Sequence, residues 1–490
     1  MSVLRPGPLP ASRDYLVLSA VQRAGWAVLL GALVAIGAFN IDLYLPAFPL
    51  LQEEFATSAV RVQVTLTGSL VGFAVGQLII GPLSDAFGRR LPVIVGLALF
   101  VLASLAAAAA PTIEVLIALR VLQGLGVAGA AVIALAMVND LFDGVGAARL
   151  IARLILVLGV APVFAPSIGS FVLTVTSWRG VFLLLAVLGA VVLVVGVTRL
   201  PETLPPVRRR AAGVRASAQT YRALLGDRAM VGLMLTAGLS IATLFSYIAG
   251  APFVLQELYG LDTQQFGLAF AAIGAALVIG TQLTGQLVTR TAPERLLVTG
   301  LSGALAASLV LAGLVVTSTG GLPGFLGALL VTALFVGVAL PTAPAMVLSR
   351  HGWAAGSASA LLGFTQFAIA GLWAPVFGSF GLRADLTMAV AMTSATILAL
   401  AVYLSSSGRS SQPSRPCIRT ATTTQSRDVH ASLSAAHRAV TGDDGWRRFP
   451  GTASAYDPTS TGDPRPRAAL LPAGRLGDAR GRRTLFLAGS

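Results

Sequence analysis

Residues 64–110 read VTLTGSLVGFAVGQLIIGPLSDAFGRRLPVIVGLALFVLASLAAAAA, and this stretch decides the fold. Two largely apolar runs, 64–83 and 92–110, flank a short loop that contains Asp85, Arg89 and Arg90. A helix needs about 20 apolar residues to cross a hydrocarbon core of about 30 Å. The stretch therefore predicts two membrane-spanning helices joined by a tight, charged turn.

Similar apolar runs recur along the chain and predict twelve spans in all. They are 26–47, 64–83, 92–110, 113–138, 150–174, 179–198, 229–253, 265–288, 296–316, 321–346, 357–381 and 386–406. A segment rich in Pro and Arg, 199–228, separates the sixth span from the seventh. Duplicated halves joined in this way are typical of secondary transporters. We therefore expect an all-α integral membrane protein with twelve transmembrane helices in two pseudo-symmetric six-helix bundles.

The predicted domains follow from these runs. They are a cytoplasmic N-terminal segment at 1–25, bundles at 26–198 and 229–406, a cytoplasmic linker at 199–228 and a tail at 407–490. The first apolar run is long enough to span, so we expect a retained helix and no cleaved signal peptide.

Composition excludes several classes of protein. The chain is 55% hydrophobic and 11% charged, with a mean hydropathy of +0.82, whereas soluble domains carry about 25% charged residues. All 34 basic residues are Arg, so the chain lacks the Lys that a phosphate-binding loop needs and cannot be its own ATPase. Its single Cys417 excludes an internal disulfide and a cysteine-based metal site. We expect no cofactor, no metal and no catalytic residues.

Arginine is distributed unevenly about the predicted spans. Seventeen arginines flank the spans on the side that holds both termini, and three lie on the opposite side. Because cytoplasmic loops carry the excess of Arg, we expect both termini in the cytoplasm and the chain in the plasma (inner) membrane. The net charge of +14 follows this topology, so no nucleic-acid partner is expected.

The loop at 81–90, GPLSDAFGRR, has the spacing G-x-L-x-D-x-x-G-R-R. Its glycines permit a tight turn, and its acid and guanidiniums can pair at helix ends. A basic cytoplasmic turn accounts for the arginine pair alone, but not for the whole spacing. The loop resembles motif A of the major facilitator superfamily in pattern and place. The resemblance implies the major facilitator fold and a conformational gating motif of Gly81, Asp85, Gly88, Arg89 and Arg90.

Arg120 and Asp42 are ionisable residues inside or near the ends of apolar spans. Such residues are functional candidates by default. Arg120 begins R-x-x-Q-G-x-G, which resembles motif B and implies a part in proton coupling for Arg120 and Gln123. Asp42 lies at a similar depth in the first span, so we expect the two to share an aqueous cavity and influence each other's charge. The alternatives are an Arg120 that snorkels to the interface and an interfacial Asp42.

The fifth predicted span contains Ala161-Pro162-Val-Phe-Ala165-Pro166-Ser-Ile-Gly169-Ser170. Two prolines can simply kink a helix. The run also resembles motif C, an antiporter signature that favours export and assigns Pro162, Pro166 and Gly169 to that motif. Ser170 stands where a second Gly is usual.

The motifs together resemble the Bcr/CflA (bicyclomycin-resistance) subfamily of drug:proton antiporters. One departure is Asn139, where the subfamily usually has Arg. The resemblance implies export of amphipathic, drug-like small molecules, with antibiotic resistance, in exchange for protons by a monomer in the lipid bilayer. The alternative is proton-coupled transport of a specific metabolite or nutrient. Since no His lies within a predicted span, a membrane enzyme is not expected, nor is a passive channel.

Other polar residues within the spans are candidates for lining a substrate cavity, although hydrogen bonding between helices is the usual reason for such residues. They are Asn40, Tyr44, Gln77, Tyr247 and Gln366.

The composition changes after Leu404 to Ser, Thr, Arg, Pro and Gly, which is typical of a disordered tail. Residues 474–483, GRLGDARGRR, nevertheless repeat the spacing of residues 81–90 without an apolar span before them. We therefore interpret 407–490 as a native tail or as a read-through or frameshift product.

The tail is expected to be dispensable. A chain that stops at residue 408 should transport as the full chain does, measured as export from cells with matched amounts of protein in the membrane. Loss of all transport on truncation would contradict this interpretation.

Overall fold

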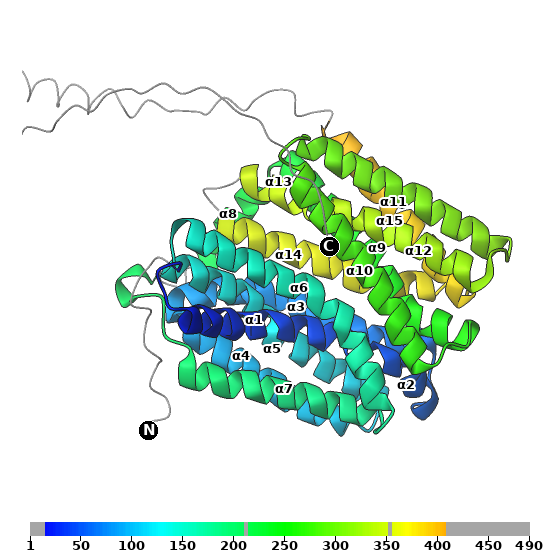
Figure 1. The fold of residues 1–490 in the computed structure, drawn as a ribbon, viewed down its shortest axis with the longest axis horizontal. Coiled ribbons are helices and arrows are strands. Elements are labelled where there is room, and N and C mark those ends of the chain that lie inside the picture. Colours follow the sequence, from blue (N-terminus) through cyan, green and yellow to red (C-terminus); the bar gives the residue numbers. More distant parts are fainter. Residues whose placement is uncertain (1–14, 210–213, 351–354, 408–490) are drawn as a thin grey trace, which may run out of the picture. The chain divides into compact units, whose positions relative to one another are not determined.

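The computed structural model describes residues 15–209, 214–350 and 355–407, which belong to one unit of the chain. Every regular element in these ranges is helical, and twelve helices are long and apolar enough to cross a membrane (Figure 1). All twelve predicted spans are confirmed in position. Residues 1–14 and 408–490, with the repeated GRLGDARGRR, lie outside the described residues.

The first half of the chain supplies six of the spans. Their helices are α1 (Ala20–Asp42) continued by η2 (Leu45–Ala47) and α2 (Phe48–Glu54), then α3 (Ala59–Phe87), α4 (Arg90–Ala108), α5 (Ile113–Leu141), α6 (Gly144–Leu173) and α7 (Trp178–Arg199). The segment that follows holds η3 (Pro206–Arg208) and α8 (Val214–Leu225). The described part of the predicted 199–228 linker is therefore partly helical.

The second half supplies the other six spans. Their helices are α9 (Arg228–Pro252) continued by η4 (Phe253–Leu258), α10 (Thr263–Leu287), α11 (Pro293–Val316), α12 (Gly321–Ala339) continued by α13 (Thr342–Arg350), α14 (Ala355–Gly378) and α15 (Ala384–Ser407). The domain boundaries at 26–198 and 229–406 remain predictions.

Proline interrupts the first span in each half near the same end. Pro46 follows α1 in a short 3₁₀ turn, and Pro252 closes α9 before a π-helical turn. Proline has no N–H to donate and its ring crowds the preceding turn, so regular α-helix ends there. The first span nevertheless continues after this turn. It runs past its predicted end at residue 47, through α2 to Glu54.

The helices pack in the same order within each half. In the first half α3 and α4 both lie along α5, α4 also lies along α7, and α1 lies along α6. In the second half α10 and α11 both lie along α12, α11 also lies along α15, and α9 lies along α14. Numbered within each half, these pairs are the same, which is the pseudo-symmetry that the sequence predicts.

Close backbone approach at glycine repeats this symmetry. A Cβ atom on Gly72 or Gly124 would overlap the backbone of the facing helix, where α3 crosses α5. Gly280 and Gly337 show the same overlap where α10 crosses α12. Because lipid tails are as apolar as Leu, helices in a membrane associate through such close packing and not through hydrophobic burial alone.

The two halves meet along two helix pairs, α3 with α14 and α6 with α10. They also meet at one end of the bundle, where η2 and α2 contact α9, α10 and η4. There the rings of Phe48 and Phe253 lie 5.7 Å apart, and Gln256 Nε2 donates to the Pro46 carbonyl at 3.3 Å. We call this the α1–α9 end.

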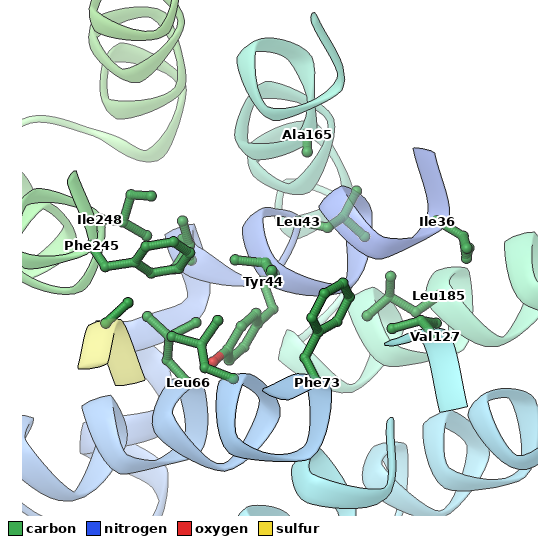
Figure 2. Packing of buried hydrophobic residues seen from close by; sticks show 14 of the residues in the cluster. Ile36, Leu43, Tyr44, Leu66, Phe73, Val127, Ala165, Leu185, Phe245 and Ile248 are labelled. Carbon is green, nitrogen blue, oxygen red and sulfur yellow. The ribbon is translucent and has the colours of Figure 1, made fainter. Parts of the chain in front are cut away.

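Buried apolar side chains continue across this junction (Figure 2). Tyr44 and Leu66 from the first half lie beside Phe245 and Ile248 from α9 in the same cluster. Phe73 on α3 and Phe367 on α14 have ring centroids 4.7 Å apart. The described arrangement is therefore closed at the α1–α9 end.

Substitution of Gly280 by Ala tests the close crossing of α10 and α12. Its Cβ would overlap the Leu334 carbonyl oxygen, so we expect a loss of about 1–3 kcal/mol in the free energy of unfolding. The measurement is thermal unfolding of the purified protein in detergent. Gly313→Ala is the matched control, because nothing lies within 4 Å of its Cβ, and it should leave the melting temperature unchanged or raise it. Equal melting temperatures for the two variants would contradict the close crossing.

Candidate functional site

The Arg120 guanidinium is fully buried inside the first half and is surrounded by neutral groups. Its Nη1 donates to Asn40 Oδ1 and to Gln123 Oε1, each at 2.9 Å, and its Nη2 donates to the Asn40 carbonyl at 2.8 Å. Its Cζ also lies 4.0 Å from the centre of the Tyr44 ring, where a cation is attracted by the π face. Arg120 therefore does not snorkel to the interface.

The groups around Arg120 are themselves held by other helices. Gln123 Nε2 donates to Ser104 Oγ on α4 at 2.7 Å, and Asn40 Nδ2 donates to Ser69 Oγ on α3 at 2.8 Å. The Tyr44 hydroxyl lies 3.2 Å from Thr65 Oγ1. One buried charge thus joins α1, α3, α4 and α5.

Asp42 is buried at the last residue of α1, with 3% of its surface exposed. In the described part of the chain its Oδ1 has no hydrogen-bond partner, and no ion pair joins it to Arg120. Its carboxylate is close enough to Tyr44 and to Tyr247 to interact with both electrostatically. Asp42 and Arg120 therefore do not form an ion pair with each other. Tyr44 is a neighbour of both residues, so any influence of one on the other is indirect.

Two further buried polar atoms, on helices that pack against α1 or η2, have no hydrogen-bond partner among the described residues. They are the Tyr247 hydroxyl on α9 and Ser170 Oγ on α6. The Tyr247 ring stacks on Phe270 of α10 with centroids 5.2 Å apart. Ser170 lies against Gly267, one turn before Phe270. Because buried polar groups are nearly always hydrogen-bonded, this cluster of Asp42, Ser170 and Tyr247 at the junction of the halves is the strongest candidate site in the described structure.

The predicted antiporter motif lies where α6 packs against the end of α1. Helix α6 runs from Gly144 to Leu173 without a break at Pro162 or Pro166. A Cβ on Gly169 would overlap the carbonyl oxygen of Leu43, the residue after Asp42. Gly169 therefore permits the close approach of α6 to the chain just after Asp42.

The other candidate cavity residues are dispersed. Asn40 and Tyr44 are fully buried and contact Arg120. Gln77 lies against Gly363 of α14, and Gln366 is half-buried on the same helix. Tyr247 alone of the five joins the Asp42 cluster.

The predicted gating motif forms a charged network at the opposite end of the bundle. Arg89 Nη1 donates to Asp85 Oδ1 at 2.7 Å and to Ser84 Oγ at 2.8 Å, and its Nε donates to Asp140 Oδ2 at 3.1 Å. Gly88 has a φ of +93°, which glycine adopts without strain. Gly81 lies in the last turns of α3, so the motif begins within helix and turns only at Gly88.

Glu202, from the segment after α7, completes this network. Its Oε1 accepts from the Arg89 backbone N–H at 2.9 Å and its Oε2 from that of Arg90 at 3.3 Å, at the start of α4. A carboxylate is stabilised at a helix N-terminus, where backbone N–H groups lack partners. Thr203 Oγ1 donates to Asp140 Oδ2 at 3.0 Å. Sequence reasoning missed Asp140 and Glu202 as partners, because nothing in their spacing reveals which loops meet.

A second set of contacts that the sequence did not reveal lies at the α1–α9 end. Glu54 at the end of α2 accepts from Trp178 Nε1 and from Arg179 at the start of α7. On the other half, Arg383 donates to Asp385 at 2.6 Å. The hydrogen bond to Asp385 raises the pKa of Arg383, so its guanidinium stays charged.

Comparison with known proteins now identifies the family. The sequence model of the Major Facilitator Superfamily matches residues 28–375. The chain belongs to the Major Facilitator Superfamily. It is therefore a multi-pass membrane transporter of small molecules and not an enzyme.

Relatives in this superfamily include transporters and drug-resistance proteins. An uncharacterized MFS-type transporter, YdgK, of Bacillus subtilis is 34% identical over 78% of this chain and 95% of its own length. A bicyclomycin resistance protein homolog of Haemophilus influenzae is 26% identical over 76% of this chain and 94% of its own. A chloramphenicol resistance protein of Pseudomonas aeruginosa is 28% identical over 69% and 80%.

Solved structures share the fold at low sequence identity. The xylose transporter XylE from E. coli, in a partially occluded inward-open conformation, is 14% identical, with a TM-score of 0.64 over 78% of this chain and 97% of its own. A bacterial homolog of the human lysosomal transporter Spinster, in an inward-facing and occupied conformation, is 16% identical, with a TM-score of 0.62 over 80% and 98%. The expected major facilitator fold is confirmed.

Glu202→Gln tests the link between the gating motif and the segment after α7. A neutral amide interacts less favourably with the N-terminus of α4 and with Arg209, whose Nη2 lies 3.8 Å from the carboxylate. We expect a loss of about 0.5–2 kcal/mol in the free energy of unfolding, measured by thermal unfolding. Glu53→Gln, at an exposed position on α2, is the matched control and should leave the melting temperature unchanged. A Glu202 variant as stable as that control would contradict the link.

Proposed function

We propose that this chain exports drug-like amphipathic small molecules in exchange for protons, by alternating access between its two halves. The observation that carries the proposal is Asp42, a buried carboxylate without an ion-pair partner among the described residues, at the place where the halves meet. The names of the bicyclomycin and chloramphenicol resistance relatives support drugs as the substrates.

Proton exchange follows from what each state does to Asp42. Burying an unpaired carboxylate is costly, and taking up a proton removes that cost. In the described arrangement the α1–α9 end is closed and Asp42 is shielded. When the halves part at this end, water reaches Asp42, and its carboxylate can take up a proton from the outside. The protonated carboxyl can be buried again at lower cost, so closure of this end is linked to proton uptake, and the proton leaves later on the cytoplasmic side.

Arg120 acts as a fixed positive charge in this scheme. Its Nη1 and Nη2 donate to Asn40 and Gln123, so it holds α1 in place without Asp42 as a direct counter-ion. Tyr44, which contacts Arg120 and interacts with Asp42, transmits a change of charge at one to the other. This is the role that we assign to the predicted coupling residues Asp42, Arg120 and Gln123.

The proposal includes an orientation. The arginine-rich side, with the gating motif, faces the cytoplasm, and the α1–α9 end faces outward. The described arrangement is then closed toward the outside, and the charged network of Arg89, Asp85 and Asp140 lies on the cytoplasmic side. The chain acts as a monomer in this proposal, since one polypeptide supplies both halves.

Asp42→Asn should abolish proton-driven export while leaving the protein in the membrane, because an amide neither takes up nor releases a proton. The measurement is susceptibility of a sensitive bacterial host to bicyclomycin and chloramphenicol, with and without expression. Asp42→Glu, which keeps an ionisable group, should retain part of the resistance. Asp143→Asn, an exposed carboxylate at the start of α6, is the control and should retain all of it.

The same assay with a protonophore separates the driving force from the substrate. Resistance conferred by the intact chain should vanish when the proton gradient collapses. Resistance that persists, or that survives Asp42→Asn, would refute proton exchange at this residue. If expression confers no resistance but proton uptake in vesicles responds to a single metabolite, the alternative of a specific metabolite transporter replaces drug export.

A further inference from the structure

A cavity of about 110 Å³ lies between the two halves at the α1–α9 end. The first half contributes the start of α3, with Val60 and Gln63, and the second half contributes residues of α9, η4, α14 and α15, among them Ser246, Phe253 and Met388. A dry cavity of roughly 150 Å³ in another protein holds benzene. The volume here therefore suits a molecule of one small ring.

The polar side chains that line this cavity are those of Gln63, Ser246 and Thr387. Gln63 Nε2 donates to the Ala249 carbonyl at 3.2 Å, which fixes the orientation of the amide and leaves Oε1 at its other side. Gln63 is 8% exposed, and its Oε1 has no hydrogen-bond partner among the described residues. The Ser246 hydroxyl donates to the Ala242 carbonyl, and the Thr387 hydroxyl donates to the Leu382 carbonyl.

The lining therefore selects the chemistry of a ligand. An occupant needs a donor for Gln63 Oε1, and the rest of it meets apolar atoms such as the Phe253 ring and the Met388 thioether. The side chains that line the cavity are uncharged, and burying a cation among them would be costly. A small neutral aromatic molecule with one hydroxyl or N–H donor fits these constraints.

We propose that this cavity binds small neutral aromatic donors of the phenol class and that an occupant holds the halves together at the α1–α9 end. The cavity exists only while α3 of the first half lies against α9, α14 and α15 of the second. A ligand that binds one arrangement shifts the equilibrium toward it. Occupancy therefore inhibits any cycle that must part the halves here. Inhibition rests on the alternating access in the proposed function, whereas binding does not.

Binding is tested on the purified full chain by saturation-transfer NMR, with phenol as the probe and toluene as its partner without a donor. Gln63→Met removes the acceptor, so buried phenol would lack its hydrogen bond. We expect phenol affinity to fall about 5-fold or more and toluene affinity to stay unchanged or rise. Gln282→Met, at an exposed position on α10, is the matched control and should alter neither affinity.

A second variant tests the place of binding. A Cβ at Gly378 would lie 3.0 Å from Val60 Cγ2 and 3.1 Å from Gln63 Oε1, so Gly378→Ala intrudes on the cavity. Phenol and toluene should both bind more weakly to the Gly378→Ala variant than to the intact chain. Their affinities for the Gly313→Ala variant should equal those for the intact chain. The proposed site is overturned if phenol does not bind the intact chain, which would leave water as the occupant. It is equally overturned if phenol binds the Gln63 and Gly378 variants as tightly as it binds the intact chain.

The effect on conformation is tested without reference to any drug. Spin labels at two exposed positions, Leu50 on α2 and Leu258 on η4, report the separation of the halves in a chain with Cys417→Ser. Saturating phenol should shift the distance distribution toward its shorter population in the intact background and not in the Gly378→Ala background. An unchanged distribution with phenol bound refutes the locking role and leaves proton-coupled export untouched.

Discussion

The buried Arg120 guanidinium constrains the first half of this transporter more than any other group. An unpaired charge in a membrane is expensive, so Asn40 and Gln123 supply neutral acceptors and Tyr44 a π face, while Ser69 on α3 and Ser104 on α4 hold the two amides in place. These contacts fix α1 against α3, α4 and α5. They also occupy Asn40 and Gln123, and the carboxylate of Asp42 receives no direct compensation from Arg120. The rigidity of one site is thus what leaves the neighbouring site free to exchange a proton in the proposed cycle.

The two halves share a packing order but not a distribution of charge. Glycine permits the same close crossing between α3 and α5 as between α10 and α12. Yet α12, the counterpart of α5, contains no ionisable residue between Gly321 and Ala339, whereas α5 buries Arg120. The second half therefore contributes a mainly uncharged surface to the junction with the first half, formed by Tyr247, Gly267 and Phe270. Symmetric packing with asymmetric chemistry is consistent with one coupling site for each chain.

Apolar length predicted the fold almost completely, because a bilayer leaves helices few alternatives. Two spans extend beyond their predicted ends, because the helix continues in a changed direction after Pro46 and after Pro252. For the site, the sequence singled out Arg120 and Asp42 because charge is rare inside apolar runs. It did not predict that Arg120 would take Asn40 and Gln123 as partners, or that Glu202 would cap α4. Those depend on which loops and helices meet in space, which a single sequence does not specify. The sequence singled out Ser170 only as a departure from motif C. Its burial without a hydrogen-bond partner is visible only in the structure.

The hold of Glu202 on the start of α4 also shortens the covalent tether between the halves. The segment from Arg199 to Leu204 is held against the first half by the hydrogen bonds of Glu202. Helix α8, from Val214, is already part of the second half, where Leu224 is buried in a cluster with residues of α9. Only about ten residues connect the two anchors, and such a strap reaches at most about 35 Å. The amplitude of any rocking motion is therefore limited by the length of this strap as well as by the packing of the helices.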